Sequence, residues 1–318
     1  MRIVSLLPSA TETLFALGLD EEIVGVSHEC DFPPRAKSKT CVVRSRLPSD
    51  ATPSEIDRLV REHVERGESI YTVDAELLEA LEPDLVITQD LCYVCAATPD
   101  ELAAALARIS KQPEILSLDP LDLGDVWRDI LWIGERTGRR ERADAFVEEI
   151  GLRLAQIEID AAYFGRRPRT VLLEWLQPCY VGGHWVPEMI SLAGGNDVLG
   201  KSKRPSYRVT IQEVIAAAPE VLFIAPCGNG AEKARDEYLS MGFPEAWKDV
   251  PAVRKGQVFA LNANDYVSRP AGRLVTGIEA MAKALHPEMK VRPKAQVAML
   301  QIGEPARYYR TAAGSSEF

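Results

Sequence analysis

The feature that most constrains the fold is an alternation, present in both halves of the chain, between short apolar runs and amphipathic helical segments. In the first half, apolar runs at residues 2–6, 23–27 and 84–89 alternate with segments of helical spacing. The alternation restarts after Pro168 and continues to Pro287. This pattern is typical of parallel sheets covered by helices, and it predicts an α/β protein with two doubly wound lobes. The run at 84–89 has little polar alternation, so we expect a strand buried on both faces.

A long helical region separates the two halves. Its second piece, within residues 139–165, predicts a helix of about 25 residues, roughly 37 Å long, which is enough to cross a whole domain. Its apolar side chains fall on one stripe at helical spacing: Ala143, Phe146, Val147, Ile150, Leu154 and Ile157. The predicted organisation is an N-terminal lobe (1–118), a helical linker with the backbone helix (119–165), a C-terminal lobe (166–287) and a partly disordered tail (288–318).

Composition and charge narrow the class of partner. The 318 residues carry a net charge of -10, which makes nucleic acid and anionic membrane surfaces poor partners. No apolar run reaches the roughly 18 residues that a membrane helix needs. The start, "MRIVSLLPSATE", places one Arg before a five-residue apolar run and then a turn, unlike a secretory signal. We therefore expect a cytoplasmic location, where the six cysteines would be reduced.

Several stretches resemble a known family. The opening "RIVSLLPSATETLFALGL", followed by "IVGVSHECDFPP", resembles the start of class III solute-binding proteins, the helical-backbone receptors for vitamin B12, ferric siderophores and haem. The stretches "LLEALEPDLVIT", "ISLAGGNDVLG", "TIQEVIAAAPEVLFI" and "VPAVRKGQVFAL" are also similar to that family. The resemblance covers about residues 1–287, and the subgroup it resembles most is the cobalamin-binding, vitamin B12 receptor-like branch.

The resemblance implies two lobes bridged by a long helix, with a ligand in the cleft between them. The resemblance implies a small molecule or a metal chelate as ligand, and a corrinoid is the first candidate. The resemblance also relates the chain to ABC transporters. The chain start, the cysteines and the reactive residue types at strand ends depart from the transport pattern. We interpret the chain as a cytoplasmic member that kept the cleft and changed its use.

Ligands of doubly wound sheets lie beyond the carboxyl ends of the strands, so the residues there are the candidates. Pro8 and Ser9 follow the first strand; Ser9 is expected to cap a helix, with Glu12 completing a capping box, and that helix N-terminus also suits an anionic group. His28 follows the second strand and is a candidate proton-transfer residue. Gln89 follows the stretch "DLVIT", residues 84–88.

Four cysteines each follow a strand that is expected to end at one face: Cys30, Cys92, Cys95 and Cys227. Two thiolates in a C-x2-C turn can reach one metal ion, and three with an open position suit an iron–sulfur cluster or a zinc ion. Cys92 and Cys95 also fit a redox pair or two buried thiols. We expect Cys30, Cys92 and Cys95 to be metal ligands with Cys227 opposite, and we interpret Cys41 and Cys179 as structural.

The second half holds a dense group of candidates after its first strand: Glu174, Trp175, Tyr180, His184 and Trp185. Glu174 and His184 are candidate proton-transfer residues, and the aromatic rings suit a flat conjugated ligand or an interior between lobes. The pair Gly182–Gly183 permits a tight turn or close backbone approach. Tyr266, Arg269 and Arg273 follow a later strand, where the two Arg side chains suit a carboxylate or phosphate, or a Glu of the protein itself.

Three functions remain open from the sequence. The first is a cytoplasmic binding protein for cobalamin or another metal chelate, which rests on the resemblance and the aromatic residues. The second is an iron–sulfur or zinc enzyme that uses Cys30, Cys92 and Cys95 on the same scaffold. The third is a thiol redox or metal-trafficking protein that uses the C-x2-C pair.

Overall fold

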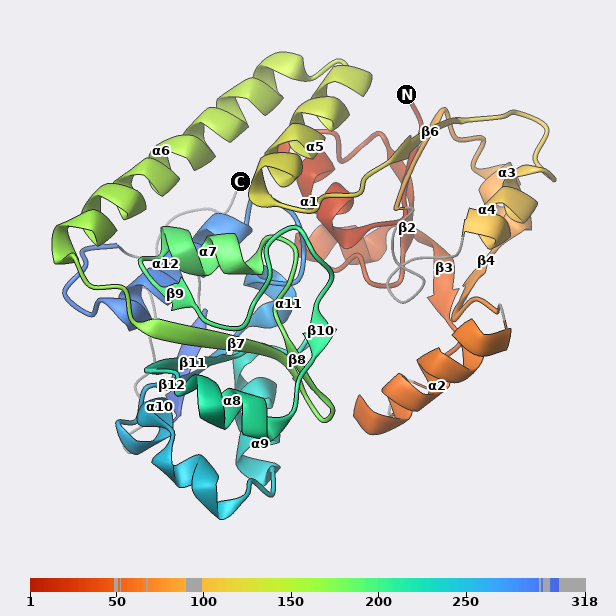
Figure 1. Cartoon of the computed structure of the whole chain (residues 1–318). Coiled ribbons are helices and arrows are strands. Elements are labelled where there is room, and N and C mark those ends of the chain that lie inside the picture. Colours follow the sequence, from red (N-terminus) through yellow and green to blue (C-terminus); the bar gives the residue numbers. More distant parts are fainter. Residues whose placement is uncertain are drawn as a thin grey trace. The chain divides into compact units, whose positions relative to one another are not determined.

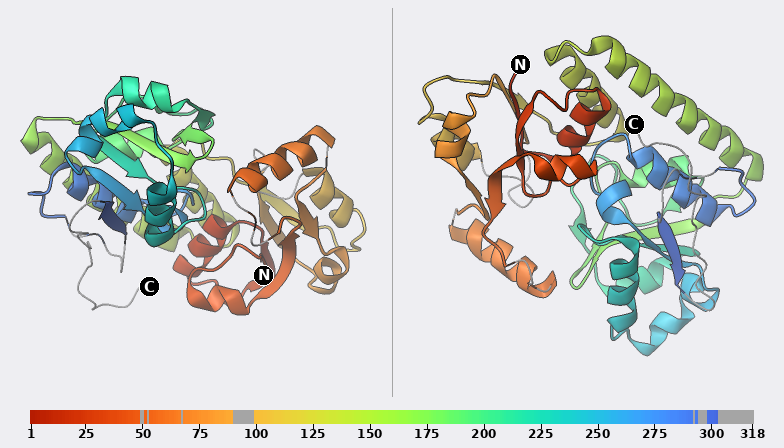
Figure 2. Two further views of the ribbon diagram at one scale, coloured as in Figure 1. Left: turned by 90° about the horizontal axis from the view of Figure 1, so that it is seen from below. Right: turned by 180° about the vertical axis from the view of Figure 1, so that it is seen from behind.

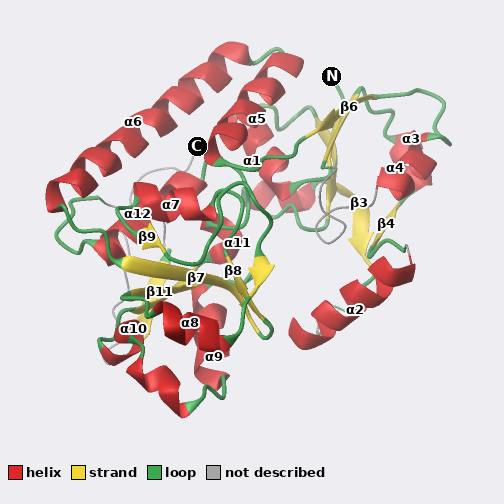
Figure 3. Cartoon of the chain, in the orientation of Figure 1, coloured by secondary structure: helices red, strands yellow, loops and turns green. Residues whose placement is uncertain are grey.

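The computed structural model describes residues 1–48, 51, 53–66, 68–89, 99–291, 293 and 298–302. The chain divides into two compact units: the first comprises Met1–Asp119 and Arg128–Phe146, and the second Pro120–Trp127 and the chain from Val147 onward. Each unit contains a sheet with helices on it, which confirms the predicted α/β class (Figures 1 and 3).

The described residues of the first unit form a six-stranded sheet in the order β4-β3-β2-β1-β5-β6. All neighbours are parallel except β4, which runs antiparallel to β3. The strands are β1 (Ile3–Ser5), β2 (Ile23–Ser27), β3 (Thr40–Ser45), β4 (Tyr71–Val73), β5 (Leu85–Thr88) and β6 (Glu114–Ser117). Every residue of β5 is buried, as its unbroken apolar run predicts.

The helices of the first unit are α1 (Pro8–Ala16), α2 (Pro53–Arg66), α3 (Ala75–Ala80) and α4 (Pro99–Leu106), with a 3-10 turn at Pro34–Ser38. The start of α1 differs from the prediction, because Leu7 is the N-cap and Pro8 occupies the first turn. Proline suits that position since its fixed φ is helical and the N–H it lacks would be unbonded there. The predicted Ser9–Glu12 capping box is therefore wrong. Gly18 follows the helix end with φ +71°, as expected.

The described residues of the second unit form a sheet in the order β10-β8-β7-β11-β12-β13, with β9 also paired to β7. Its strands are β7 (Arg169–Leu176), β8 (Cys179–Val181), β9 (Asn196–Asp197), β10 (Tyr207–Arg208), β11 (Val221–Ile224), β12 (Val258–Leu261) and β13 (Met299–Ile302). β7, β11 and β12 are parallel, whereas β8 turns back on β7 as a hairpin and β13 runs antiparallel to β12. The sequence pattern assigned no element after Pro287, yet Met299 and Leu300 are buried in β13.

Helices cover both faces of this sheet (Figure 1). They are α7 (Val186–Leu192), α8 (Ile211–Ala217), α9 (Ala231–Ser240), α10 (Pro251–Arg254), α11 (Ala263–Tyr266) and α12 (Leu274–Leu285), with a 3-10 turn at Glu245–Asp249. Leu172, Phe223 and Phe259 pack with residues of α7 and α12, while their strand neighbours pack with α8 and α9. This alternation of side chains between two apolar cores is what parallel strands covered on both sides require.

Two long helices contribute residues to both units, α5 (Leu123–Arg136) and α6 (Arg140–Phe164). α6 has 25 residues, the length that the sequence predicts, and it is visible in the views of Figures 1 and 2. On the predicted stripe, Ala143, Ile150 and Ile157 are buried to 2% exposure or less. The apolar spacing therefore identified the packed face correctly.

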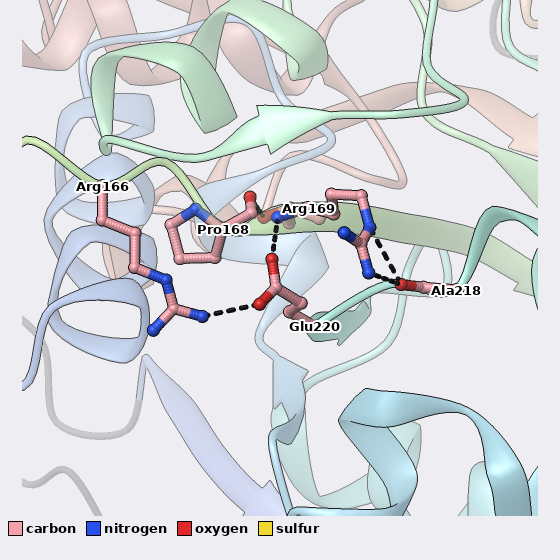
Figure 4. Close-up of polar contacts among 6 residues, drawn as sticks. Arg166, Pro168, Arg169, Ala218 and Glu220 are labelled. Atoms are coloured by element: carbon pink, nitrogen blue, oxygen red, sulfur yellow. Dashed lines mark hydrogen bonds and ion pairs between the residues drawn. The ribbon is translucent and has the colours of Figure 1, made fainter.

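A polar network fixes the chain where α6 gives way to β7 (Figure 4). The Glu220 carboxylate accepts from Arg166 Nη2 at 2.6 Å and from the Arg169 backbone N–H at 3.0 Å. The Arg169 guanidinium donates to the Ala218 carbonyl at 3.0 and 3.2 Å. The Arg169 N–H, aided by the two guanidinium groups, lowers the pKa of Glu220, so this carboxylate remains ionised.

Candidate functional site

In the first unit, the residues after β1 and β2 form a buried cluster of hydroxyl groups around a thiol. Thr11 Oγ1 lies 2.8 Å from Ser5 Oγ and 3.0 Å from Cys30 Sγ, and Ser27 Oγ lies 3.3 Å from the same sulfur. None of these four residues is more than 5% exposed. In this surrounding Cys30 packs as a small polar core residue, with hydroxyl groups as its neighbours.

The predicted metal site lies largely outside the described residues, because Cys92 and Cys95 fall in the gap between residues 89 and 99. Among the residues that the structure describes, no three His, Cys, Asp or Glu side chains lie close enough together to hold a metal ion. Cys227 belongs to the second unit, where its exposed sulfur lies 3.5 Å from Ser268 Oγ. The cysteine site thus remains a prediction.

Burial raises the pKa of the Cys179 thiol to about 11.

The other first-unit candidates lie at strand ends, as expected. Pro8 and Ser9 form the first turn of α1, and Gln89 follows β5 directly, half-buried. His28 follows β2; its Nε2 lies 3.2 Å from Glu29 Oε1 and its Nδ1 lies 3.1 Å from the Val43 carbonyl. The hydrogen bond with Glu29 outweighs partial burial and raises the pKa of His28.

Among the described carboxyl groups of the second unit, Glu174, near the carboxyl end of β7, has the largest shift in pKa. Burial raises its pKa to about 7, against the lowering effect of its hydrogen bonds from Ser206 and from the Gly183 backbone. The Ser206 hydroxyl donates to Glu174 Oε2 at 2.5 Å and accepts from the Gly183 N–H at 3.2 Å. Near neutral pH, this carboxyl group is therefore poised between its acid and its carboxylate.

Asp197 on β9 is a second buried carboxyl group that acts on Glu174. Burial raises its pKa, and its charge contributes to the raised pKa of Glu174. Its Oδ1 accepts the Leu199 and Gly200 N–H groups at 3.0 and 2.7 Å. Its Oδ2 is buried with no hydrogen-bond partner among the described residues. Neither Asp197 nor Ser206 was found by sequence reasoning, since an Asp after a glycine pair and a loop Ser carry no distinctive spacing.

His184 lies in a tight turn that follows the Gly182–Gly183 pair. A side chain on Gly183 would collide with the Arg204–Ser206 backbone, which explains one glycine of the predicted pair. His184 has φ +47°, and its N–H donates to the Arg204 carbonyl at 2.6 Å. Burial lowers the pKa of its imidazole, so the ring is neutral near pH 7.

The aromatic candidates Trp175, Tyr180 and Trp185 lie on the β7–β8 hairpin and at the start of α7. Trp175 and Tyr180 are partners across the β7–β8 hairpin. Trp185 begins α7, its ring lies 5.6 Å from that of His184, and its indole N–H donates to the Val267 carbonyl at 2.8 Å. Trp175, Tyr180 and Trp185 are half-buried, so each presents part of a ring to solvent or ligand.

The two predicted Arg ligands do not share a helix face. Arg269 is buried in the loop after α11, and Arg273 is the N-cap residue of α12. Arg273 Nη1 lies 3.4 Å from Asp265 Oδ1, and its guanidinium carbon lies 5.6 Å from the centre of the Tyr266 ring. The sequence left open a pairing with an acidic residue of the protein, and for Arg273 that residue is Asp265.

Backbone hydrogen bonds join β7 to the loop after β11, and that loop to α11, which follows β12. The Cys227 N–H donates to the Glu174 carbonyl at 3.2 Å, and the Asn264 N–H donates to the Asn229 carbonyl at 3.2 Å. We call the following residues at this edge the second-unit site: Glu174, Trp175, Tyr180, His184, Trp185, Ser206, Cys227 and Tyr266. These residues span 92 positions of the sequence, and their part in ligand binding stays a prediction.

None of the helices in the described part of the chain has the length and apolar character of a membrane span. Residues 3–264 match the model of the family described as periplasmic binding protein. The vitamin B12-binding protein of Vibrio cholerae is 25% identical to this chain over 292 residues, which is 89% of this chain and 88% of the relative.

Two solved structures show the same fold. The periplasmic vitamin B12 binding protein of Vibrio cholerae aligns with a TM-score of 0.66 at 25% identity, covering 91% of this chain and 98% of the other. The periplasmic heme-binding protein RhuT of Roseiflexus sp. RS-1 aligns with a TM-score of 0.67 at 23% identity, covering 90% and 98%. Since the family match spans most of the chain, this protein is a member of the periplasmic binding protein family, the solute-binding proteins of the class III type.

Proposed function

We propose that this solute-binding protein takes a corrinoid of the cobalamin type as its ligand, and that the second-unit site contacts it. The observation that carries the proposal is the alignment with a vitamin B12-binding protein over 89% of this chain. An alignment of that extent includes the strand-end loops as well as the scaffold. The fold alone would not name a ligand, because a heme-binding protein has it too.

The chemistry of the second-unit site supports a broad, flat and largely uncharged ligand. Trp175, Tyr180 and Trp185 each offer a half-buried ring face. Burial lowers the pKa of His184, so its ring is neutral near pH 7, and the raised pKa of Glu174 keeps part of that carboxyl group protonated. A corrin macrocycle combines apolar ring surface with many amide side chains, which neutral hydrogen-bonding groups satisfy without the cost of desolvating a charge.

The metal-dependent alternatives rest on Cys92 and Cys95, which lie outside the described residues, so an iron–sulfur, zinc or thiol redox role remains a prediction from the sequence. The cytoplasmic location also remains a prediction, and fractionation of the native host would test it.

Titration of the protein with cyanocobalamin, followed by visible absorbance after equilibrium dialysis, tests the proposal. We expect saturable binding at one ligand per chain, with hemin bound at least about tenfold more weakly, a difference of about 1.4 kcal/mol. Tighter binding of hemin than of cyanocobalamin would refute the corrinoid assignment.

Paired variants test the place of binding. Trp175→Ala removes a half-buried ring of the second-unit site and is expected to weaken cyanocobalamin binding about tenfold. The matched control is Trp132→Ala on α5, where the ring is 40% exposed and stacks with Arg128 in the first unit. Equal losses in both variants would mean that the second-unit site has no special part in binding.

A further inference from the structure

Helix α6 is apolar on two opposite faces. One face carries Ile150 and Ile157, which are buried against the protein. The other carries Leu152, Ile159 and Tyr163, which are 68%, 65% and 87% exposed. These three are spaced by seven and four residues, so they lie in one row along the helix. We call this row the outer α6 stripe, and all of it belongs to the second unit.

The outer α6 stripe is a concentration of apolar surface, not a scatter of single residues. Of the seven large hydrophobic residues that are exposed in the described part of the chain, these three share one helix face. Ala145 falls on the same side of the helix and is exposed too, whereas the exposed Gln156 on that side is polar and donates to Asp160. Exposed single apolar residues need no explanation, whereas a contiguous row on a rigid helix is typical of an interaction surface.

The charges at the two ends of the stripe are opposite. Glu148 and Glu149 lie one turn before Leu152, and Arg166 and Arg167 lie one turn after Tyr163. Arg166 uses Nη2 toward Glu220, yet its side chain is 68% exposed and a guanidinium has five N–H donors. A surface with acidic residues at one end and basic residues at the other is complementary to itself when it is turned end to end.

We propose that the outer α6 stripe is the interface of a two-fold symmetric homodimer, in which α6 of two copies pack antiparallel. Leu152 of one copy then lies beside Tyr163 of the partner subunit, and the two Ile159 side chains lie near the axis. Glu148 and Glu149 lie near Arg167 and Arg166 of the partner subunit. The small side chains of Ala155 and Ala162 flank the row and permit close approach of the two helices.

The contact area sets the strength of this dimer. A single pair of five-to-seven-turn helices buries less than the roughly 1,200 Å² of a standard stable interface. The dimer is therefore weak, and its population depends on protein concentration across the micromolar range.

Sedimentation equilibrium of the full-length protein from about 1 to 200 μM tests the proposal. We expect a monomer–dimer equilibrium, with a dissociation constant that Ile159→Lys raises at least about tenfold, since it places two cations at the axis. Leu239→Lys is the matched control, because Leu239 is 62% exposed on α9, outside the stripe, and it leaves the equilibrium unchanged. Circular dichroism verifies that both variants fold.

Two outcomes overturn the proposal. One is a monomer at every concentration, whatever else then covers the stripe. The other is a dimer that Ile159→Lys and Leu239→Lys weaken equally, because its interface lies elsewhere. Added salt supplies a second measurement: 0.5 M NaCl weakens a dimer with these end-to-end ion pairs a few-fold, and strengthening by salt would contradict the predicted charge pairing.

Discussion

The two units differ in the kind of polar side chain that they bury near strand ends. In the first unit, Ser5, Thr11, Ser27 and Cys30 are buried together, and the three hydroxyl groups do not ionise at physiological pH. In the second unit, Glu174 on β7 and Asp197 on β9 are carboxyl groups with raised pKa values, and burial lowers the pKa of His184. Neutral hydroxyl groups that satisfy one another cost little to bury, whereas carboxyl groups cost more as they ionise.

This difference assigns different roles to the two regions. The hydroxyl and thiol cluster around Cys30 packs in the interior of the first unit. In the second-unit site, burial shifts the pKa values of titratable groups, which is a common property of sites that bind ligands or transfer protons. Three perturbations, in order of decreasing effect, test the contrast.

The largest expected effect is the pH dependence that Glu174 imposes on stability. Its pKa in the folded protein is about 7 against an ordinary 4.5, so the unfolded chain loses this proton first as the pH rises. The free energy of unfolding therefore falls between these two pH values, by up to about 3 kcal/mol at 1.36 kcal/mol for each pKa unit.

Glu174→Gln keeps an amide oxygen for Ser206 and removes the ionisation, so most of this fall disappears. Urea denaturation from pH 4.5 to 8 measures it, and Glu232→Gln, an exposed position on α9, is the control. If the slopes of Glu174→Gln and the wild-type protein agree, then the carboxyl group is solvated and the contrast fails.

The second perturbation is Thr11→Val in the first unit. It removes the hydroxyl group that lies 2.8 Å from Ser5 Oγ and 3.0 Å from Cys30 Sγ. We expect a loss of about 1–2 kcal/mol, equal at pH 5 and pH 8, because the hydroxyl groups of Thr11, Ser5 and Ser27 do not ionise in that range.

Thr13→Val serves for comparison, since its buried hydroxyl donates to the Ser9 carbonyl of its own helix and its loss costs less. A pH-dependent effect of Thr11→Val would break the distinction between the two regions.

The smallest effect concerns two histidines with opposite shifts. The hydrogen bond with Glu29 raises the pKa of His28, and burial lowers that of His184, so NMR titration should find His28 protonated at higher pH. Glu29→Gln lowers the pKa of His28 and leaves His184 unchanged. The stabilisation from this pair is below about 1 kcal/mol; it is complete below the ordinary pKa of 6.5 and is lost as the pH rises through the folded value.

The sequence predicted what depends on periodicity and strand ends. The two α/β units, the 25-residue α6 and the buried run at β5 follow from apolar spacing, which is a local property. It missed β13, because a strand of four residues far from its partner β12 has no local signal. The prediction of Ser9 as the cap of α1 is wrong, because Pro8, whose fixed φ is helical, already occupies the first turn.

The members of the candidate site come from the sequence and stay a prediction, whereas the pKa values of the site depend on long-range packing. Glu174, Trp175, Tyr180, His184 and Trp185 form one stretch of chain, so their proximity was visible. Ser206 and Asp197 reach Glu174 only through the pairing of β8 with β10 and of β7 with β9. The raised pKa of Glu174 arises from that long-range packing, and no spacing in the sequence reports it.

Isothermal titration calorimetry of the purified protein with cyanocobalamin at pH 7 tests directly whether the protein binds a corrinoid. We expect one site per chain and a dissociation constant in the micromolar range or below, which Trp175→Ala raises about tenfold. Absence of binding heat at two temperatures, up to several hundred micromolar ligand, with the protein shown to be folded, would contradict it.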